Sequence, residues 1–387
     1  MKDLKIFAKT IETEALEQIE TLLAQEPFKG CKVRIMPDVH AGAGCVIGFT
    51  ANLGDKVIPN VVGVDIGCGM LTVNLGNIEI DYEKLDRIIR KYVPSGFDVH
   101  NKYDLCPMIE TLVCYKKLKN VDRLHASLGT LGGGNHFIEI DEDVKGTKYL
   151  IIHTGSRNLG KQVADIYQNI AIFTLSEQKD EALALITQLK DEGREHEIPK
   201  TLKRLKKNRP KLPRDLCYVE GIDMTNYLFD MKICQNFAHI NREKIADVLC
   251  EKMEWDRGSQ FHTIHNYIDD EGMVRKGAIS AYAGEKVLIP LNMRDGCILG
   301  LGLGNADWNY SAPHGAGRLM SRTKAKAELS LSEYKETMSD IFTTSISSKT
   351  LDEAPQAYKP TSEIVSYIKD TVQVLEIIKP VYNFKAN

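Results

Sequence analysis

Apolar positions recur at helical spacing in two short stretches near the start of the chain. Residues 12–25 (ETEALEQIETLLAQ) combine this spacing with strong helix formers, which predicts an amphipathic helix, and residues 83–92 predict another. Between them, residues 31–75 form short β-branched runs broken by Gly and Pro, a pattern typical of strands that end in tight turns. These runs are CKVRIMPDVH, GCVIGFTANL, VVGVDIGCG and MLTVNL.

The remaining chain alternates between strand and helix patterns on a larger scale. Residues 129–157 predict strands with Gly-rich connections, whereas residues 160–256 have a period near 3.6 and little Gly, which predicts a helical insertion or subdomain. Short strands and glycines return after residue 258, and the last element, which begins at EIVSYIKD, ends in a strand that carries Lys385. The pattern therefore predicts an α+β fold.

Composition and charge narrow the class of protein. The 387 residues hold 50 Lys and Arg against 53 Asp and Glu, a net charge of −3, so a polyanion must be bound locally rather than by a global basic field. The N-terminus lacks an apolar leader, and no stretch reaches the roughly 18 to 20 apolar residues that span a bilayer. Nine cysteines without C-x-x-C spacing favour reduced thiols, some of them ligands. We expect a cytosolic protein that does not enter a membrane.

Half of the ten histidines stand at predicted strand ends or beside glycines. In these places the backbone permits close approach of a ligand, and functional side chains are usually displayed there. One such histidine alone is more often a hydrogen-bonded loop residue, but five together indicate a functional site. They are His40, His136, His153, His265 and His314.

Asp65 and Cys68 lie in VVGVDIGCGM, an apolar run that stops at glycines. A buried carboxylate is costly unless it is paired or binds a metal, so one interpretation is a cation held by both side chains. The other is a capped turn with an inert cysteine, and the spacing alone does not separate the two. Thiolate, imidazole and carboxylate together suit Mn, Fe, Co or Zn, whereas an all-oxygen Mg or Ca site would not need Cys68.

Two further motifs suggest phosphate binding. Residues 155–161 (GSRNLGK) fit G-x-x-x-x-G-K, but Gln162 stands where a P-loop needs Ser or Thr. Residues 200–214 (KTLKRLKKNRPKLPR) hold eight basic and no acidic residues, so this run either contacts RNA phosphates or is a solvated surface.

Taken together and in order, several long motifs closely resemble the RtcB family of RNA ligases. They are GVDIGCG, GGGNHFIE, HTGSRNLGKQVA, IHNY, LNMRDG, SAPHGAGRLMSR and the lysine near the C-terminus. The resemblance covers nearly the whole chain. It implies a single domain over residues 1–387, with central β-sheets surrounded by helices and the helical insertion at 160–256.

The resemblance also implies an activity. Members of this family join an RNA 3′-phosphate or 2′,3′-cyclic phosphate end to a 5′-hydroxyl end, using GTP and two Mn²⁺ ions, through a covalent histidine–GMP intermediate. The substrate would be RNA. Relatives that act in tRNA splicing and relatives that act in RNA repair share these motifs, so the motifs are consistent with either role.

The family's functional residues carry over to named positions. His314 would be the guanylylated nucleophile. The two manganese ions would be bound by Asp65, Cys68, His136, His153 and His265, with the Cys68 thiolate bridging. The GMP pocket would be lined by Asn135, His136, Phe137, Ile138, Glu139, His265, Asn266, Pro290, Leu291, Asn292, Met293, Cys297, His314, Gly315, Ala316, Gly317 and Lys385.

Two alternatives use the same residues. A metal-dependent phosphoesterase would use the Asp, Cys and His cluster to hydrolyse cyclic phosphates without ligation. A non-catalytic RNA-binding module would descend from a degenerate ligase, and loss of a nucleophile or ligand would be its sign. Every one of the motif positions above is intact, which favours the ligase.

Overall fold

The computed structural model describes residues 3–177, 179–202 and 212–386. Its largest element is a seven-stranded sheet in which all neighbouring strands are antiparallel. In spatial order the strands are β13 (Lys286–Asn292), β14 (Gly296–Gly302), β16 (Val372–Lys385), β6 (Phe137–Glu142), β7 (Lys148–Thr154), β5 (Gly69–Gly76) and β9 (Gln260–Ile264). The last long strand, β16, thus lies in the middle of the sheet and brings the C-terminus beside β6.

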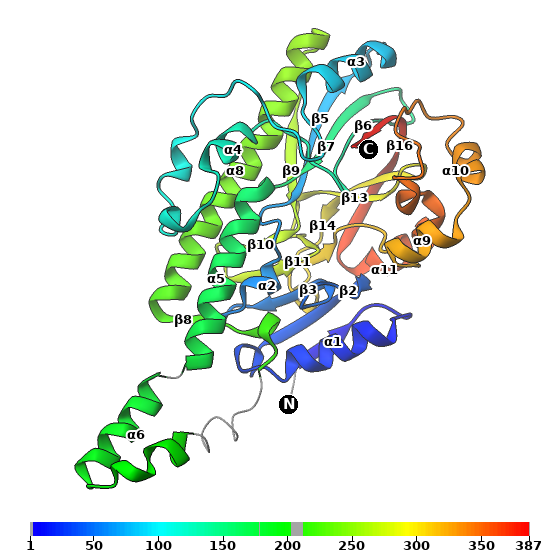
Figure 1. Ribbon diagram of the computed structural model, residues 1–387. Helices are drawn as coiled ribbons and strands as arrows, with labels where there is room; N and C mark the ends of the chain where they lie inside the picture. The colour runs from blue at the N-terminus through cyan, green and yellow to red at the C-terminus, as the bar shows by residue number, and fades with distance from the viewer. Residues whose placement is uncertain (1–2, 178, 203–211, 387) are drawn as a thin grey trace.

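A second sheet lies next to the first in Figure 1 and has five strands. Its order is β1 (Asp3–Ile6), β2 (Lys32–His40), β3 (Ile47–Asn52), β11 (Met273–Lys276) and β10 (Asn266–Ile268). Only the β1–β2 pair is parallel. Two short pairs complete the strands, β12 (Ala278–Ser280) with β15 (Ser311–Pro313) and β4 (Lys56–Val57) with β8 (Val219–Glu220).

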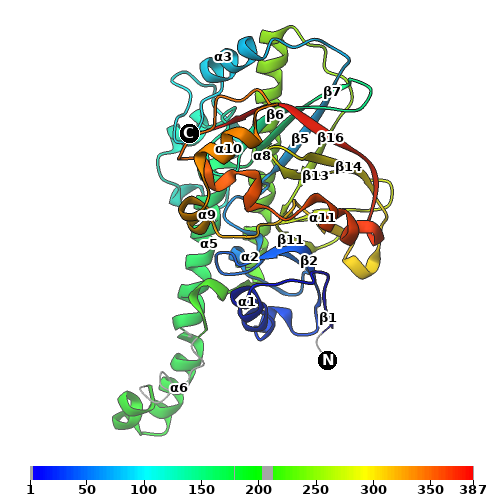
Figure 2. The same ribbon diagram turned by 90° about the vertical axis from the view of Figure 1, so that its right-hand side faces the viewer.

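Helices surround these sheets. In Figure 1, α5 and α8 run along one side and α9, α10 and α11 lie on the other, while Figure 2 shows α6 extending away from the body. In the part of the chain that the structure describes, the α-helices are α1 (Thr13–Leu23), α2 (Pro59–Val62), α3 (Tyr82–Tyr92), α4 (Val121–Ala126), α5 (Arg157–Glu177), α6 (Lys179–Asp191), α8 (Gly221–Met253), α9 (Arg322–Glu328), α10 (Leu331–Thr337) and α11 (Thr361–Tyr367). No helix in the described ranges is long and apolar enough to span a membrane.

Helix α8 connects the two main hydrophobic clusters. Its N-terminal half buries residues such as Phe237 in the cluster that includes the five-stranded sheet, and its C-terminal half buries residues such as Leu249 against the seven-stranded sheet. Because a helix buried on most sides has apolar residues all round, α8 shows no single polar face. This helix therefore fixes the position of one sheet relative to the other.

The α+β fold class is confirmed, and both predicted helices near the start of the chain are present as α1 and α3. The stretch from 160 to 256 is mainly helical, as its period predicts. The prediction of a strand at VVGVDIGCG is wrong, because Val61 and Val62 end helix α2 and residues 64–67 form a turn. Most of the basic run at 200–214 lies outside the described residues.

Candidate active site

The predicted metal ligands stand at the ends of four neighbouring strands of the large sheet. Strands β6 and β5 begin, and strands β7 and β9 end, at the same edge, as the pairing of Phe137 with His153 and of Gly69 with Ile264 requires. The side chains at these four strand ends therefore lie close together. The side chains gathered there are Cys68, His136, His153 and His265, together with Asp65 from the turn before β5.

A tight turn joins Asp65 to Cys68. The Cys68 amide donates to the Asp65 carbonyl at 3.1 Å, and the Asn266 side chain donates to the same carbonyl at 3.3 Å. Gly67 has a φ of +72°, and a Cβ there would lie 2.9 Å from the backbone of Gln235. Only glycine meets both conditions without strain. The turn therefore explains why this apolar run is not a strand.

The five side chains form a compact cluster. The Cys68 Sγ lies 3.5 Å from His136 Nε2 and 3.4 Å from His153 Nε2, and these three residues form a group suited to a metal ion. The Asp65 carboxylate lies 3.0 Å from His136 Nε2. The His265 ring packs against that of His153, with 5.2 Å between centroids. The ligand types are those that Mn, Fe, Co or Zn accept.

Backbone carbonyls set the tautomers of two histidines. His136 Nδ1 lies 2.9 Å from the Leu131 carbonyl and His153 Nδ1 lies 3.1 Å from the Asn135 carbonyl. Since a carbonyl only accepts, each Nδ1 carries a hydrogen, and each Nε2 is left to point at the cluster. Metal-binding histidines are oriented in this way. The buried His265 Nδ1 has no hydrogen-bond partner among the described residues, as expected of an atom reserved for a cation.

The electrostatics of the cluster also fit a cation. Burial raises the pKa of the Cys68 thiol well above its usual range, and the Asp65 charge raises it further. Burial lowers the pKa of His153 and His265, so both imidazoles are neutral. A thiol in this environment ionises when a cation binds the thiolate that forms, and neutral imidazoles are the form that binds metal. The residues therefore fit the manganese ions that the resemblance implies.

Arg242 of α8 holds the strand ends in place from behind. Its side chain is fully buried and donates from Nη1 to the carbonyls of Gly67 and Thr154, both at 2.9 Å. Each of these carbonyls belongs to a residue next to a cluster ligand, Cys68 or His153. The sequence does not single out Arg242, because it occupies one position in a long stretch with helical spacing.

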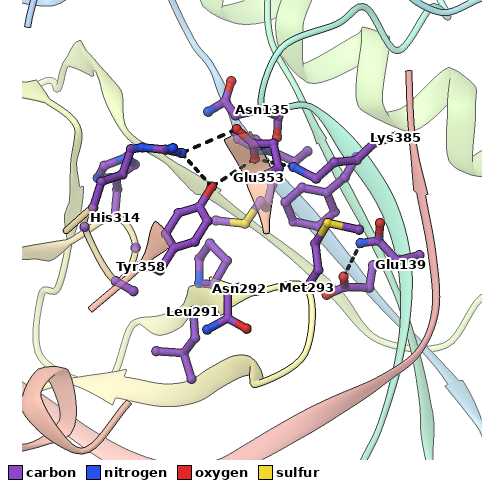
Figure 3. Close-up of a pocket in the computed structure, with 18 of the residues that line it drawn as sticks. Asn135, Glu139, Leu291, Asn292, Met293, His314, Glu353, Tyr358 and Lys385 are labelled. Atoms are coloured by element: carbon purple, nitrogen blue, oxygen red, sulfur yellow. Dashed lines mark hydrogen bonds and ion pairs between the residues drawn. The ribbon is translucent and has the colours of Figure 1, made fainter. Parts of the chain in front are cut away.

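A pocket opens directly beside the cluster, and Figure 3 shows His314 on one side and Glu139 and Lys385 on the other. It is lined by His40, Met70, Asn135, Phe137, Glu139, His153, His265, Pro290, Leu291, Asn292, Met293, His314, Gly315, Ala316, Gly317, Arg318, Arg322, Glu353, Tyr358, Asn383 and Lys385. Because His153 and His265 also belong to the cluster, the pocket and the cluster form one site.

His314 is oriented by Asp38 of β2. Its Nδ1 lies 2.6 Å from the Asp38 carboxylate, which also accepts the His314 backbone amide at 3.1 Å. Asp38 is fully buried, whereas the His314 side chain remains 20% exposed. The Nδ1 hydrogen is thus committed to Asp38, and Nε2 faces the pocket with its lone pair. Nucleophilic and basic histidines are held by a carboxylate in the same manner.

Positive charge gathers around Glu353 at the back of the pocket. Its carboxylate contacts Arg318, Arg322 and Lys385, and it accepts a hydrogen bond from the Tyr358 hydroxyl at 2.9 Å (Figure 3). Burial alone would raise the pKa of Glu353, but Lys385 and Arg322 outweigh it and lower the pKa to about 2. Arg322 also pairs with Asp352 at 2.6 Å, so three cations face two carboxylates and one net positive charge remains for an anionic ligand such as a phosphate chain.

The structure places most of the predicted pocket residues in the pocket lining and four of them outside it. Ile138 points to the opposite face of β6, in the hydrophobic core. Asn266 supports the Asp65 turn, and Cys297 lies behind Glu139, with 3.9 Å between its Sγ and that carboxylate. His136 belongs to the metal cluster, where the sequence also places it.

Several pocket residues were not singled out by the sequence analysis. Arg318 and Arg322 stand inside the motif SAPHGAGRLMSR, and the buried Asp38, which contacts His314 from behind the pocket, stands in the run CKVRIMPDVH. Glu353 and Tyr358 come from a stretch without a recognisable motif. The P-loop interpretation of residues 155–161 is not supported, because α5 begins at Arg157 and the exposed Lys161 pairs with Asp165 on the helix surface.

A pair of buried carboxyl groups, Glu139 and Asp141, stands at the wall of the pocket beside Cys297, and the three groups lie within 4.8 Å of one another. Burial raises the pKa of Glu139 to about 7, and burial together with the Glu139 charge raises that of Asp141 further. Two buried carboxyls so close cannot both ionise. The pair therefore retains at least one proton at neutral pH.

We expect Asp141→Asn to make the protein more stable than the wild type as pH rises. Because the folded-state pKa of Asp141 lies above the unfolded value, the contribution of the protonated Asp141 to stability is fully present below about pH 4 and falls by about 1.4 kcal/mol per pH unit above it. Asparagine resembles the protonated acid and does not ionise. Urea unfolding at pH 5.5 and 7.5 measures the difference, and the exposed Asp256→Asn serves as the control. An unchanged pH slope in Asp141→Asn would show that Asp141 is ionised in the folded protein.

Comparison with known proteins places this fold and site in a class. The chain matches the family described as tRNA-splicing ligase RtcB over residues 18–116 and 108–386. It is 28% identical to the RNA-splicing ligase RtcB of Escherichia coli K12 over 96% of this chain and 94% of that protein. The tRNA-splicing ligases RtcB of Nanoarchaeum equitans and Aeropyrum pernix are 28% and 27% identical, over 86% and 93% of this chain and 83% and 89% of theirs.

An oriented histidine, a cationic pocket and a cluster of Cys and His side chains at the ends of neighbouring strands are features compatible with a metal-dependent enzyme that acts on a phosphorylated ligand. The match over nearly the whole length then decides the family. The chain belongs to the RtcB family.

Proposed function

We propose that this protein is a GTP- and manganese-dependent RNA ligase that joins RNA 3′-phosphate or 2′,3′-cyclic phosphate ends to 5′-hydroxyl ends. The observation that carries the proposal is the placement of His314. Its Nε2 opens into a cationic pocket that shares two histidines with a metal-ligand cluster, while Asp38 holds its Nδ1. The similar proteins from Escherichia coli and Nanoarchaeum equitans are named RNA-splicing and tRNA-splicing ligases, which supports the same activity.

In the first step, His314 Nε2 would attack the α-phosphorus of GTP. A phosphorus–nitrogen bond forms, and pyrophosphate leaves with the electron pair of the broken bond. Asp38 stabilises the positive charge that develops on the imidazole. Arg318, Arg322 and Lys385 would bind the phosphates, and the Glu139 carboxylate, on the side of the pocket opposite His314, would accept hydrogen bonds from the base.

The cluster would hold two manganese ions, one bound by Asp65, Cys68 and His136 and the other by Cys68, His153 and His265. Bound Mn²⁺ supplies Lewis-acid stabilisation of phosphate charge. The chain's own contribution is to fix the ligands, through the two histidine tautomers and the Asp65 turn, and to place His265 between the cluster and His314, 4.9 Å from the His314 ring centroid.

In the following steps, GMP would pass from His314 to the RNA 3′-phosphate, which activates it. The 5′-hydroxyl of the second strand then attacks the activated phosphorus, the new phosphodiester forms and GMP leaves. A cyclic phosphate end would first be hydrolysed to a 3′-phosphate. Both RNA ends must therefore reach the rim of one pocket.

The test is to incubate the protein with GTP labelled at the α-phosphate, Mn²⁺ and RNA with defined ends. A protein label that is stable to alkali and labile to acid, formed before RNA is joined, would support the proposal. Conversion of a cyclic phosphate end without GTP consumption and without joining would instead identify a phosphoesterase. RNA binding with neither reaction would identify a non-catalytic module.

We expect Asp38→Asn to slow formation of the protein–GMP adduct by about 10²- to 10⁴-fold, as removal of an orienting carboxylate does elsewhere. The amide keeps the shape of the side chain but cannot hold the Nδ1 hydrogen with a negative charge. The rate of labelling with GTP measures the effect. Unchanged labelling would show that Asp38 only supports the fold.

A further inference from the structure

The buried Arg242 of α8 has a single side-chain partner among the described residues. Its Nη1 donates to the carbonyls of Gly67 and Thr154, and its Nε donates to His262 Nδ1 at 3.2 Å. Its Nη2 has no hydrogen-bond partner within the described ranges. On the side away from the metal-ligand cluster, His262 of β9 is therefore the side chain that fixes the guanidinium.

The tautomer of His262 follows from its two partners. Arginine Nε only donates, so His262 Nδ1 carries a lone pair. The ring hydrogen is then on Nε2, which donates to the Glu243 carboxylate at 2.6 Å. Burial lowers the pKa of His262 to about 4, with Arg242 and His239 acting in the same direction. The imidazole is thus neutral at neutral pH and keeps the lone pair that Arg242 needs.

The Glu243 carboxylate is itself held in place. Arg257 forms an ion pair with it at 2.6 Å, and both side chains are partly exposed, at 20% for Glu243 and 24% for Arg257. A chain of hydrogen bonds therefore runs from the protein surface, through a carboxylate and an imidazole, to the fully buried Arg242. A carboxylate that fixes an imidazole tautomer in this way is common behind metal sites.

Arg242 acts on the cluster through the backbone. The two carbonyls that it holds belong to the residues next to Cys68 and His153. The Cys68 Sγ and His153 Nε2 lie 3.4 Å apart, close enough to bind one cation. Ligand side chains must be held to within about 0.5 Å of the productive geometry. A shift of Arg242 would displace both ligands together.

A surface metal site is another interpretation of these side chains. His239, Glu243 and His262 offer ligand atoms within 4.8 Å of one another, and the two imidazole rings lie 4.0 Å apart. The tautomer opposes this interpretation. To bind a cation through Nε2, His262 would have to carry its hydrogen on Nδ1, where it would face the Nε hydrogen of Arg242. The geometry favours orientation of Arg242 over metal binding at the surface.

We propose that His262 is a positioning residue for the metal-ligand cluster. It holds Arg242 so that the turn before β5 and the end of β7 present Cys68 and His153 to the same cation. The inference rests on the proposed function only in that the cluster binds metal. It assigns no metal ligand and no proton transfer to His262 itself.

Two amide variants separate the two hydrogen bonds of His262. In His262→Asn the side-chain oxygen is bonded to Cγ, as Nδ1 is, so it can accept from Arg242. In His262→Gln the amide lies one bond further out, at the place of Nε2, so it can reach Glu243 but leaves Arg242 Nε without its acceptor. We expect His262→Gln to bind Mn²⁺ about 10- to 100-fold more weakly than wild type, and His262→Asn to bind it nearly as tightly as wild type.

The measurement is titration of the metal-free full-length proteins with Mn²⁺, followed by electron paramagnetic resonance of the free ion. Titration with Co²⁺ adds a spectroscopic readout, because a thiolate bound to Co²⁺ gives a charge-transfer band that reports on Cys68. His239→Ala is the matched control, since it removes the ring beside His262 but no hydrogen bond of the chain. It should bind Mn²⁺ like wild type. Urea unfolding of the metal-free variants measures their stability separately.

Three results would overturn the assignment. They are wild-type Mn²⁺ affinity in His262→Gln, equal weakening in the Asn and Gln variants, and weakening that follows the loss of stability rather than the loss of the Arg242 acceptor. An additional bound cation that disappears in both His239→Ala and His262→Asn would identify a surface metal site in place of a positioning residue. Failure of the wild type itself to bind Mn²⁺ or Co²⁺ would instead refute the metal dependence of the proposed function.

Discussion

Replacement of His314 by alanine is expected to abolish both the protein–GMP adduct and the joining of RNA while leaving metal binding intact. The reason is geometric. Among the histidines of the site, His136 and His153 direct Nε2 at the Cys68 sulfur, whereas His314 directs Nε2 into the pocket. The cluster ligands remain in place without His314, so manganese content should equal that of the wild type.

The measurement is labelling with α-labelled GTP, followed by mass spectrometry of the labelled peptide. His314→Asn is the matched variant, because its amide can still contact Asp38 but is not a nucleophile, and His239→Ala is a control at an exposed position. Both His314 variants should lose the adduct, and the control should retain it. Label on a peptide without residue 314 would sink the assignment and the mechanism with it.

Removal of the Cys68 thiol should reduce RNA joining about as strongly as loss of His314, but through loss of bound metal rather than loss of the nucleophile. In Cys68→Ala a methyl group replaces a ligand to which two imidazoles point at 3.4 and 3.5 Å. We expect bound manganese to fall and RNA joining to drop by at least about two orders of magnitude, since losses of that size follow even from changes to residues that only orient metal ligands.

Metal analysis of the purified variants decides between a ligand and a packing role. Cys45→Ala is the matched control, because Cys45 is equally buried but lies outside the cluster. It should lose some stability and keep its metal. If Cys68→Ala retains the wild-type manganese content and joins RNA normally, Cys68 is a packing residue.

Local pattern accounts for much of the fold. Apolar spacing alone predicts α1 and α3, the strands that begin at Lys32 and Ile47, and the helical stretch that contains α8. It fails at VVGVDIGCG, because an apolar run has the same composition in a strand and in a buried turn. The register of the sheets, including the central place of β16, depends on pairings between residues 70 to 248 positions apart in the chain, which periodicity does not contain.

The candidate site, like the fold, has features that the sequence predicts and features that only the tertiary structure shows. The sequence by itself determined the family and the residue types of the candidate site, because thiol, imidazole and carboxylate groups in Gly-rich motifs carry the resemblance and single out Cys68 and His314. Only the tertiary structure showed which side chains contact these residues. Asp38 reaches His314 and Glu353 reaches Lys385 across separate parts of the chain. Such contacts depend on how the two sheets pack, and packing is a property of the whole fold rather than of any local pattern.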